Sequence, residues 1–109
     1  MMVEKRRHGR FPLVLEASWD ESGSNSRGRT TDLSVTGCFI DTLLQVAVGE
    51  TLDFKIRTPD GEHISVAGKV MYQQQSLGFG VRFTKISDAD RLRLDAILNT
   101  RNQQDRRTG

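Results

Sequence analysis

The chain has 109 residues, which is enough for one domain with a single modest core. Its 16 Lys and Arg residues nearly balance 14 Asp and Glu residues, so the net charge is only +2, and the mean hydropathy is −0.49. No apolar run approaches the ~20 residues of a membrane-spanning helix, and the N-terminus lacks the apolar stretch of a secretory signal, so we expect a cytoplasmic protein without membrane insertion. The single cysteine, Cys38, excludes an intrachain disulfide and a cysteine-built metal site.

Alternating hydrophobic residues predict strands in the first half of the chain. From Phe11 to Trp19, every second residue from Leu13 onward is apolar, which is the period of a half-buried strand. The following Glu21–Gly28 has the composition of a loop. We then expect a short strand at Arg29–Thr31 and a buried strand at Cys38–Ile40.

The second half of the chain shows the same period. Thr51–Thr58, His63–Gln73 and Leu77–Phe83 each place apolar side chains at alternate positions. Between the first two, Thr58-Pro59-Asp60-Gly61 is a strong turn signal, because proline presets φ and glycine tolerates a positive φ. This brings the number of predicted strands to six, joined by short connections.

A helix is predicted after the last strand. Ser87 can cap its start, and the acids Asp88 and Asp90 suit the positive end of the helix dipole. We expect the helix to end near Asn99 and to dock through its apolar face of Leu94, Ile97 and Leu98. The pattern therefore predicts an all-β, six-stranded barrel with one C-terminal α-helix over residues 11–99, because a sheet that closes on itself has no exposed edges. Residues 1–10 are expected to be a flexible basic segment and residues 100–109 a disordered tail.

The basic segment is the first candidate for binding chemistry. Residues 5–10, Lys5-Arg6-Arg7-His8-Gly9-Arg10, carry four cations and no acid. Guanidinium groups grip phosphate with paired hydrogen bonds, and they can bond the O6 and N7 edge of guanine or stack on its ring. Taken alone, such a segment is also typical of an ordinary solvated basic terminus.

The second candidate is Asp32-Leu33-Ser34-Val35-Thr36-Gly37, which lies between two predicted strands. Asp32 and Ser34 offer a carboxylate and a hydroxyl, and the carboxylate can accept hydrogen bonds from N1 and N2 of a guanine. Gly37 permits a bend or a close approach that a Cβ would block. An ordinary turn, in which Asp32 and Ser34 bond their own backbone, is the alternative interpretation.

Together the two motifs resemble the PilZ domain family of bacterial cyclic di-GMP receptors. RxxxR stands at Arg6–Arg10 and DxSxxG at Asp32–Gly37, and the resemblance extends through Gly78–Phe83 to the start of the helix, so that it covers about residues 4–99. It implies a six-stranded antiparallel barrel plus helix, in agreement with the strand pattern. It also implies second-messenger signalling by nucleotide binding.

The resemblance implies the following site. Arg6 and Arg10 would contact phosphates and guanine faces, Asp32 and Ser34 a guanine edge or phosphate, and Gly37 would line the approach of the ligand. Lys5 precedes the first motif arginine, the position that in this family influences whether one ligand or a stacked pair binds. Its charge favours the pair, whereas lysine lacks the flat stacking surface of arginine. Arg7 and His8 would add supporting charge at most.

These observations predict a non-enzymatic receptor for cyclic di-GMP that orders its N-terminal segment on binding and signals to a partner protein. A ligand-independent interaction adaptor with the same fold is the first alternative. A small-barrel nucleic-acid binder is disfavoured, because only 6% of residues are aromatic and no strand carries exposed aromatics spaced for base stacking. An enzyme is disfavoured by the lack of a nucleophile–base pair, and no cofactor or metal site is expected.

Overall fold

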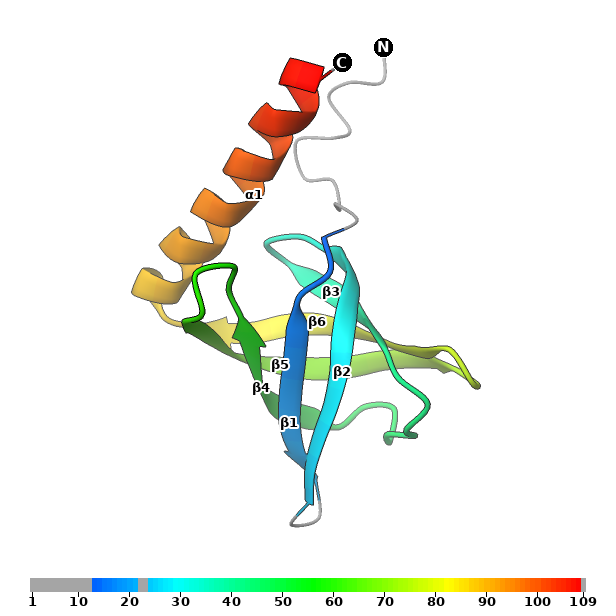
Figure 1. Cartoon of the computed structure of the whole chain (residues 1–109). Coiled ribbons are helices and arrows are strands. Elements are labelled where there is room, and N and C mark those ends of the chain that lie inside the picture. The colour runs from blue at the N-terminus through cyan, green and yellow to red at the C-terminus, as the bar shows by residue number, and fades with distance from the viewer. Residues whose placement is uncertain (1–12, 22–23, 109) are drawn as a thin grey trace.

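The computed structural model describes residues 13–21 and 24–108, which form six strands and one helix (Figure 1). In chain order these are β1 (Glu16–Glu21), β2 (Ser24–Leu33), β3 (Gly37–Asp41), β4 (Thr51–Arg57), β5 (His63–Gln74), β6 (Gly78–Ile86) and α1 (Asp88–Thr108). All paired strands are antiparallel, and the sheet closes in the order β1-β2-β3-β6-β5-β4. The predicted six-stranded barrel with a C-terminal helix is confirmed.

The barrel interior is built from the alternate residues that the sequence places on one face of each strand. In β4, for example, Leu52, Phe54 and Ile56 are buried while the residues between them are exposed. Trp19 is buried, with its ring centroid 5.7 Å from that of Phe54 and 5.4 Å from that of Phe79. Aromatic rings in such tilted and edge-on arrangements add about 0.5–1.5 kcal/mol per pair beyond the area they bury.

The three largest differences from the predicted boundaries concern β1, β2 and the helix. β1 begins at Glu16 rather than Phe11. β2 begins at Ser24, so most of the predicted loop Glu21–Gly28 is strand, paired with β1 in a register that sets Trp19 opposite Ser26. Strand pairing satisfies backbone groups whatever the side chains are, and polar residues are tolerated where a hairpin faces water.

The helix is the third difference, since α1 continues to Thr108 and does not end near Asn99. The predicted disordered tail 100–109 is therefore helical as far as Thr108. Arg and Gln are good helix formers, and no glycine or proline interrupts the run before Gly109.

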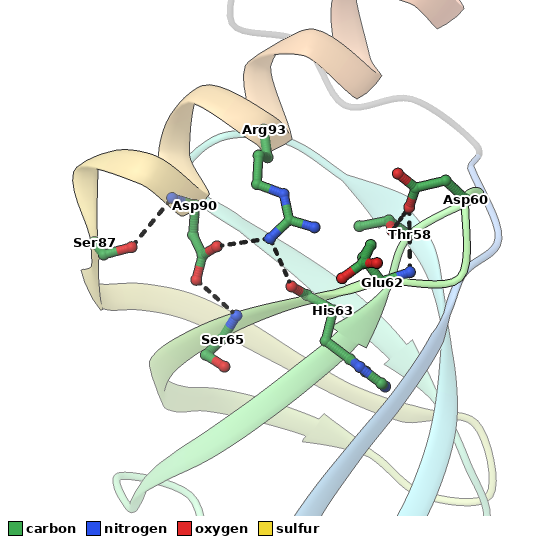
Figure 2. Close-up of polar contacts among 8 residues, drawn as sticks. All are labelled: Thr58, Asp60, Glu62, His63, Ser65, Ser87, Asp90 and Arg93. Carbon is green, nitrogen blue, oxygen red and sulfur yellow. Dashed lines mark hydrogen bonds and ion pairs between the residues drawn. The ribbon is translucent and has the colours of Figure 1, made fainter.

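Side chains from the first turns of α1 hold the helix to β5 (Figure 2). The Ser87 hydroxyl accepts a hydrogen bond from the backbone N–H of Asp90 at 3.1 Å, which confirms the predicted cap. The Asp90 carboxylate accepts from the N–H of Ser65, and Arg93 donates to the carbonyl of His63, each at 3.1 Å. Leu94 and Leu98 are buried against the barrel, with Ile97 packed beside them, as predicted.

The turn between β4 and β5 forms as the sequence predicts. The N–H of Gly61 donates to the Thr58 carbonyl at 2.9 Å, and Gly61 has a φ of 89°. The Asp60 carboxylate accepts hydrogen bonds from the Thr58 hydroxyl and from the N–H of Glu62 (Figure 2). These two donors lower the pKa of Asp60 from its ordinary 3.8.

Candidate ligand-binding site

The DxSxxG motif forms the tight connection between β2 and β3, as predicted. The N–H of Ser34 donates to the Gly37 carbonyl at 2.9 Å and closes the turn. The Ser34 hydroxyl oxygen accepts from the N–H of Thr36 at 3.2 Å, lies 3.1 Å from the Thr36 hydroxyl, and is 3.3 Å from the Gly37 carbonyl. Ser34 is only 1% exposed. Its side chain therefore stabilises the turn from within, which is the backbone-bonding arrangement considered above as an alternative.

Position 37 requires a glycine because the backbone of β6 lies too close for a Cβ. It is the first residue of β3, opposite Arg82 of β6, and a Cβ placed on it would overlap the carbonyl oxygen of Val81. The N–H of Phe83 also donates to the Thr36 carbonyl at 2.8 Å. The motif turn is thus hydrogen-bonded to β6, and Gly37 permits the close approach of its own backbone to that of Val81.

Asp32 differs from Ser34 in keeping access to solvent. It is the last but one residue of β2, lies opposite Phe39 of β3 just after a register irregularity, and is intermediate in exposure. The structure thus brings Asp32, Ser34 and Gly37 into one turn, with Asp32 partly exposed and the serine hydroxyl inside. Arg6, Arg10, Lys5, Arg7 and His8 lie outside the described residues.

Thr30 ties the chain that follows the basic segment to β2. Its hydroxyl donates to the Leu13 carbonyl at 2.8 Å and accepts from the N–H of Leu15 at 2.9 Å, while its own N–H donates to the Leu15 carbonyl at 2.8 Å. Thr30 is fully buried and stands two residues before Asp32. Sequence reasoning missed this residue, because a single threonine in a polar stretch gives no signal of a contact 17 residues away.

Two aromatic residues next to the motif were also missed as surface groups. Phe39 was predicted in a buried run, but it alternates outward between Cys38 and Ile40, each 1% exposed. Its ring centroid lies 6.2 Å from that of Tyr72 of β5, at 34° between the ring planes, and Tyr72 is 48% exposed. Within the described residues no single strand carries exposed aromatics spaced for stacking, but this pair forms between β3 and β5, which are distant in sequence.

Three other residues with polar or reactive side-chain groups, Trp19, Cys38 and His63, have structural roles. Trp19 and Cys38 are core residues, and in the described part of the chain the Trp19 Nε1 has no hydrogen-bond partner. His63 is exposed and contributes its backbone carbonyl to the helix contact. The described residues contain no group of three or more His, Cys, Asp or Glu side chains that could hold a metal ion. Among them, too, no helix has the length and apolar character needed to cross a membrane.

Comparison with known proteins places this fold and motif in a family. The sequence matches the family model described as the PilZ domain over residues 4–100. No curated protein matches it significantly.

Several solved structures share the fold. The chain is similar to the inhibitor of motility MotI/DgrA of Bacillus subtilis, with a TM-score of 0.75, 18% identity, and coverage of 91% of this chain and 52% of that one. It is similar to YcgR from Escherichia coli, solved in complex with c-di-GMP, with a TM-score of 0.80, 16% identity, and coverage of 95% and 49%. The PilZ domain of CeSA from a cellulose-synthesizing bacterium follows, with a TM-score of 0.62, 17% identity, and coverage of 84% and 97%. The chain spans about half the length of the first two proteins.

Proposed function

The chain belongs to the PilZ domain family, and from this premise we propose that it is a cytoplasmic, non-enzymatic receptor for cyclic di-GMP. The observation that carries the proposal is the intact DxSxxG turn, in which Asp32 is partly exposed, while Thr30 of the same strand bonds the chain that follows the RxxxR segment. The chain that follows one half of the family's binding motif is therefore bonded to the strand that carries the start of the other half.

Chain geometry limits how far the arginines can be from this turn. Leu13 is bonded to Thr30, only Phe11 and Pro12 separate Leu13 from Arg10 in the sequence, and three residues of fully extended chain span at most ~11 Å. The arginine side chain adds further reach. A ligand on the surface beside Asp32 is accordingly within range of the basic segment.

The ligand's chemistry matches the groups available. Arg6 and Arg10 would grip phosphates with charge-assisted hydrogen bonds and stack on guanine faces. Asp32 would accept hydrogen bonds from N1 and N2 of a guanine, while Ser34 and Gly37, which are buried, would support binding by holding the shape of the same turn. Lys5 and Arg7 would add positive charge, and Lys5 would influence whether one ligand or a stacked pair is bound.

The proposed output is an order–disorder change. Binding would order residues 1–10 against the barrel, and a partner protein would recognise the ordered form. Hydrogen exchange of the amides in residues 1–10 should slow when cyclic di-GMP is added. Exchange that stays unchanged at saturating ligand would reject this output while leaving the receptor function in place.

Isothermal titration with cyclic di-GMP tests the receptor function itself. Arg6→Ala and Arg10→Ala should each weaken binding roughly 10- to 100-fold, since a hydrogen bond to a charged group contributes about 1.5–3 kcal/mol. Arg27→Ala is the matched control, because Arg27 is an exposed arginine of β2 five residues from Asp32, about 16 Å along the strand. No binding to the unmodified protein at tens of micromolar ligand would favour the ligand-independent adaptor.

A further inference from the structure

A groove of about 500 Å³ lies between α1 and the turn that joins β4 to β5. The residues that line it come from three parts of the chain and include Leu13, Pro59, Asp60, Arg93, Ala96 and Ile97. Figure 2 shows Arg93 on the helix and Asp60 on the turn. Pro59 and Ala96 are exposed, and Leu13 and Ile97 are only half-buried, so apolar surface is left open to water. An apolar side chain placed in the groove would remove that surface from water, which is favourable.

The N-terminal segment of the same chain is attached at this groove. Leu13 lines the groove and is the first described residue, and Phe11 precedes it by two positions. Two residues of extended chain span at most ~7 Å, so a Phe11 side chain is within reach. Phe11 lies outside the described residues and is the only Phe, Tyr or Trp among residues 1–12. A group tethered so closely has an effective concentration on the order of millimolar, which favours it over a separate partner molecule.

Local chain geometry favours the side of the chain that faces the groove for Phe11. Leu13 packs against the core while Val14 is 58% exposed, as in an extended chain whose side chains alternate. Pro12 disfavours helical angles for the residue before it, so we expect Phe11 to be extended as well. The same alternation then sets Phe11 on the side of Leu13 and sets Arg10 on the opposite side.

We infer that the ring of Phe11 docks in the groove between α1 and the β4–β5 turn and thereby ties the RxxxR segment to the helix. Arg10, the next residue, is then directed away from the groove and is available to a ligand. A segment anchored at one end before the ligand arrives has less conformational freedom to lose on binding. Phe11 is accordingly a positioning residue. Its effect on affinity rests on the proposed receptor function, whereas the docking itself does not.

The methyl resonance of Ala96 tests the docking without any ligand. An aromatic ring packed on a methyl group changes its chemical shift, so the Ala96 resonance should move when Phe11→Leu removes the ring. The methyl of Ala89, which is exposed on the same helix and does not line the groove, should not move. Val14→Ala is the control variant and should leave both resonances in place. An unmoved Ala96 methyl in Phe11→Leu, or a shift that depends on protein concentration because a second copy fills the groove, would overturn the inference.

Titration with cyclic di-GMP tests the positioning role. Phe11→Ala should weaken binding roughly 3- to 10-fold, because the ligand alone must then order the segment, and Phe11→Leu should lose less. Val14→Ala should keep the wild-type affinity. Full affinity in folded Phe11→Ala would overturn the positioning role. If the wild-type protein does not bind while its Ala96 methyl still responds to Phe11→Leu, the receptor function is rejected and the docked ring stands.

Ala96→Gln covers the case in which Phe11→Ala does not fold, because it alters the helix side of the contact and leaves the N-terminal segment intact. The longer polar side chain should displace the ring and weaken cyclic di-GMP binding to a similar extent. Ala89→Gln is the matched control on the same helix. Equal affinities of these two variants would contradict a link between the groove and the RxxxR segment.

Discussion

The Asp90 carboxylate accepts a hydrogen bond from the backbone N–H of Ser65 at 3.1 Å. Val66 is the first residue of β5 that pairs with β6, so Ser65 lies just beyond the end of that pairing. The Asp90 side chain therefore supplies the acceptor for the N–H of Ser65 where β6 does not reach. The same carboxylate lies 3.3 Å from Arg93, which itself donates to the His63 carbonyl. A two-residue network on α1 thus satisfies the exposed end of β5 and sets the position of the helix.

Asp90→Ala should therefore loosen the helix. We expect a loss of about 1 kcal/mol in the free energy of unfolding, below the usual 1.5–3 kcal/mol for a hydrogen bond to a charged group because the contact is partly exposed to solvent. Asp88→Ala is the matched control, since Asp88 is an acid in the same helical turn and is exposed. Urea denaturation measures both, and an equal loss in the two variants would mean that only the helix dipole is involved.

Gly37→Ala should be the more damaging of two glycine substitutions. The added Cβ overlaps the Val81 carbonyl, so β3 must move away from β6, and overpacking of this kind costs about 1–3 kcal/mol. At Gly61 a Cβ meets nothing within 4 Å, but φ is 89°, so Gly61→Ala should cost about 1 kcal/mol from backbone strain alone. Thermal or urea unfolding compares the two, and a smaller loss for Gly37→Ala would contradict the close approach of the motif turn to β6.

Ser34→Ala distinguishes a structural from a direct role of the motif serine. Removing the buried hydroxyl leaves the N–H of Thr36 without its acceptor, and we expect a loss of about 1–2 kcal/mol in unfolding free energy. Thr84→Ala removes an exposed hydroxyl that donates to the Ala67 carbonyl and should cost less. If Ser34→Ala lowered ligand affinity without lowering stability, the hydroxyl would act on the ligand and not through the turn.

Protonation of Asp60 should lower the free energy of unfolding of the protein in acid. Its pKa in the folded state lies below 3.8, because the Thr58 hydroxyl and the N–H of Glu62 favour the charged form. A depressed folded-state pKa means that the stabilising contribution is complete above pH 3.8 and is lost as the pH falls through the folded-state value. Asp60→Asn keeps an acceptor oxygen but cannot titrate. Between pH 5 and pH 2.5, its unfolding free energy should fall less than that of the wild type, and parallel curves would contradict this assignment.

The sequence predicts the inside and outside of the barrel well, because side chains alternate across a strand with a period of two. Leu52, Phe54 and Ile56 are buried as expected, and the Ser87 cap and the Pro59–Gly61 turn form where local residue chemistry places them. The strand at Ser24–Gly28 was missed because its polar composition carries no such period, and only pairing with β1 makes it a strand.

For the candidate site, the sequence by itself determined the identity of the two motifs and the place of DxSxxG between two strands, since both depend on residues close together along the chain. Tertiary structure alone decided which residues surround the motif. Thr30 meets Leu13 because β2 pairs with β1, and Tyr72 comes into line with Asp32 because β6 lies beside β3 and β5 beside β6. Neighbours of this kind arise from pairing between distant strands, whose register is set by packing of the whole barrel, and no local pattern in the chain records it.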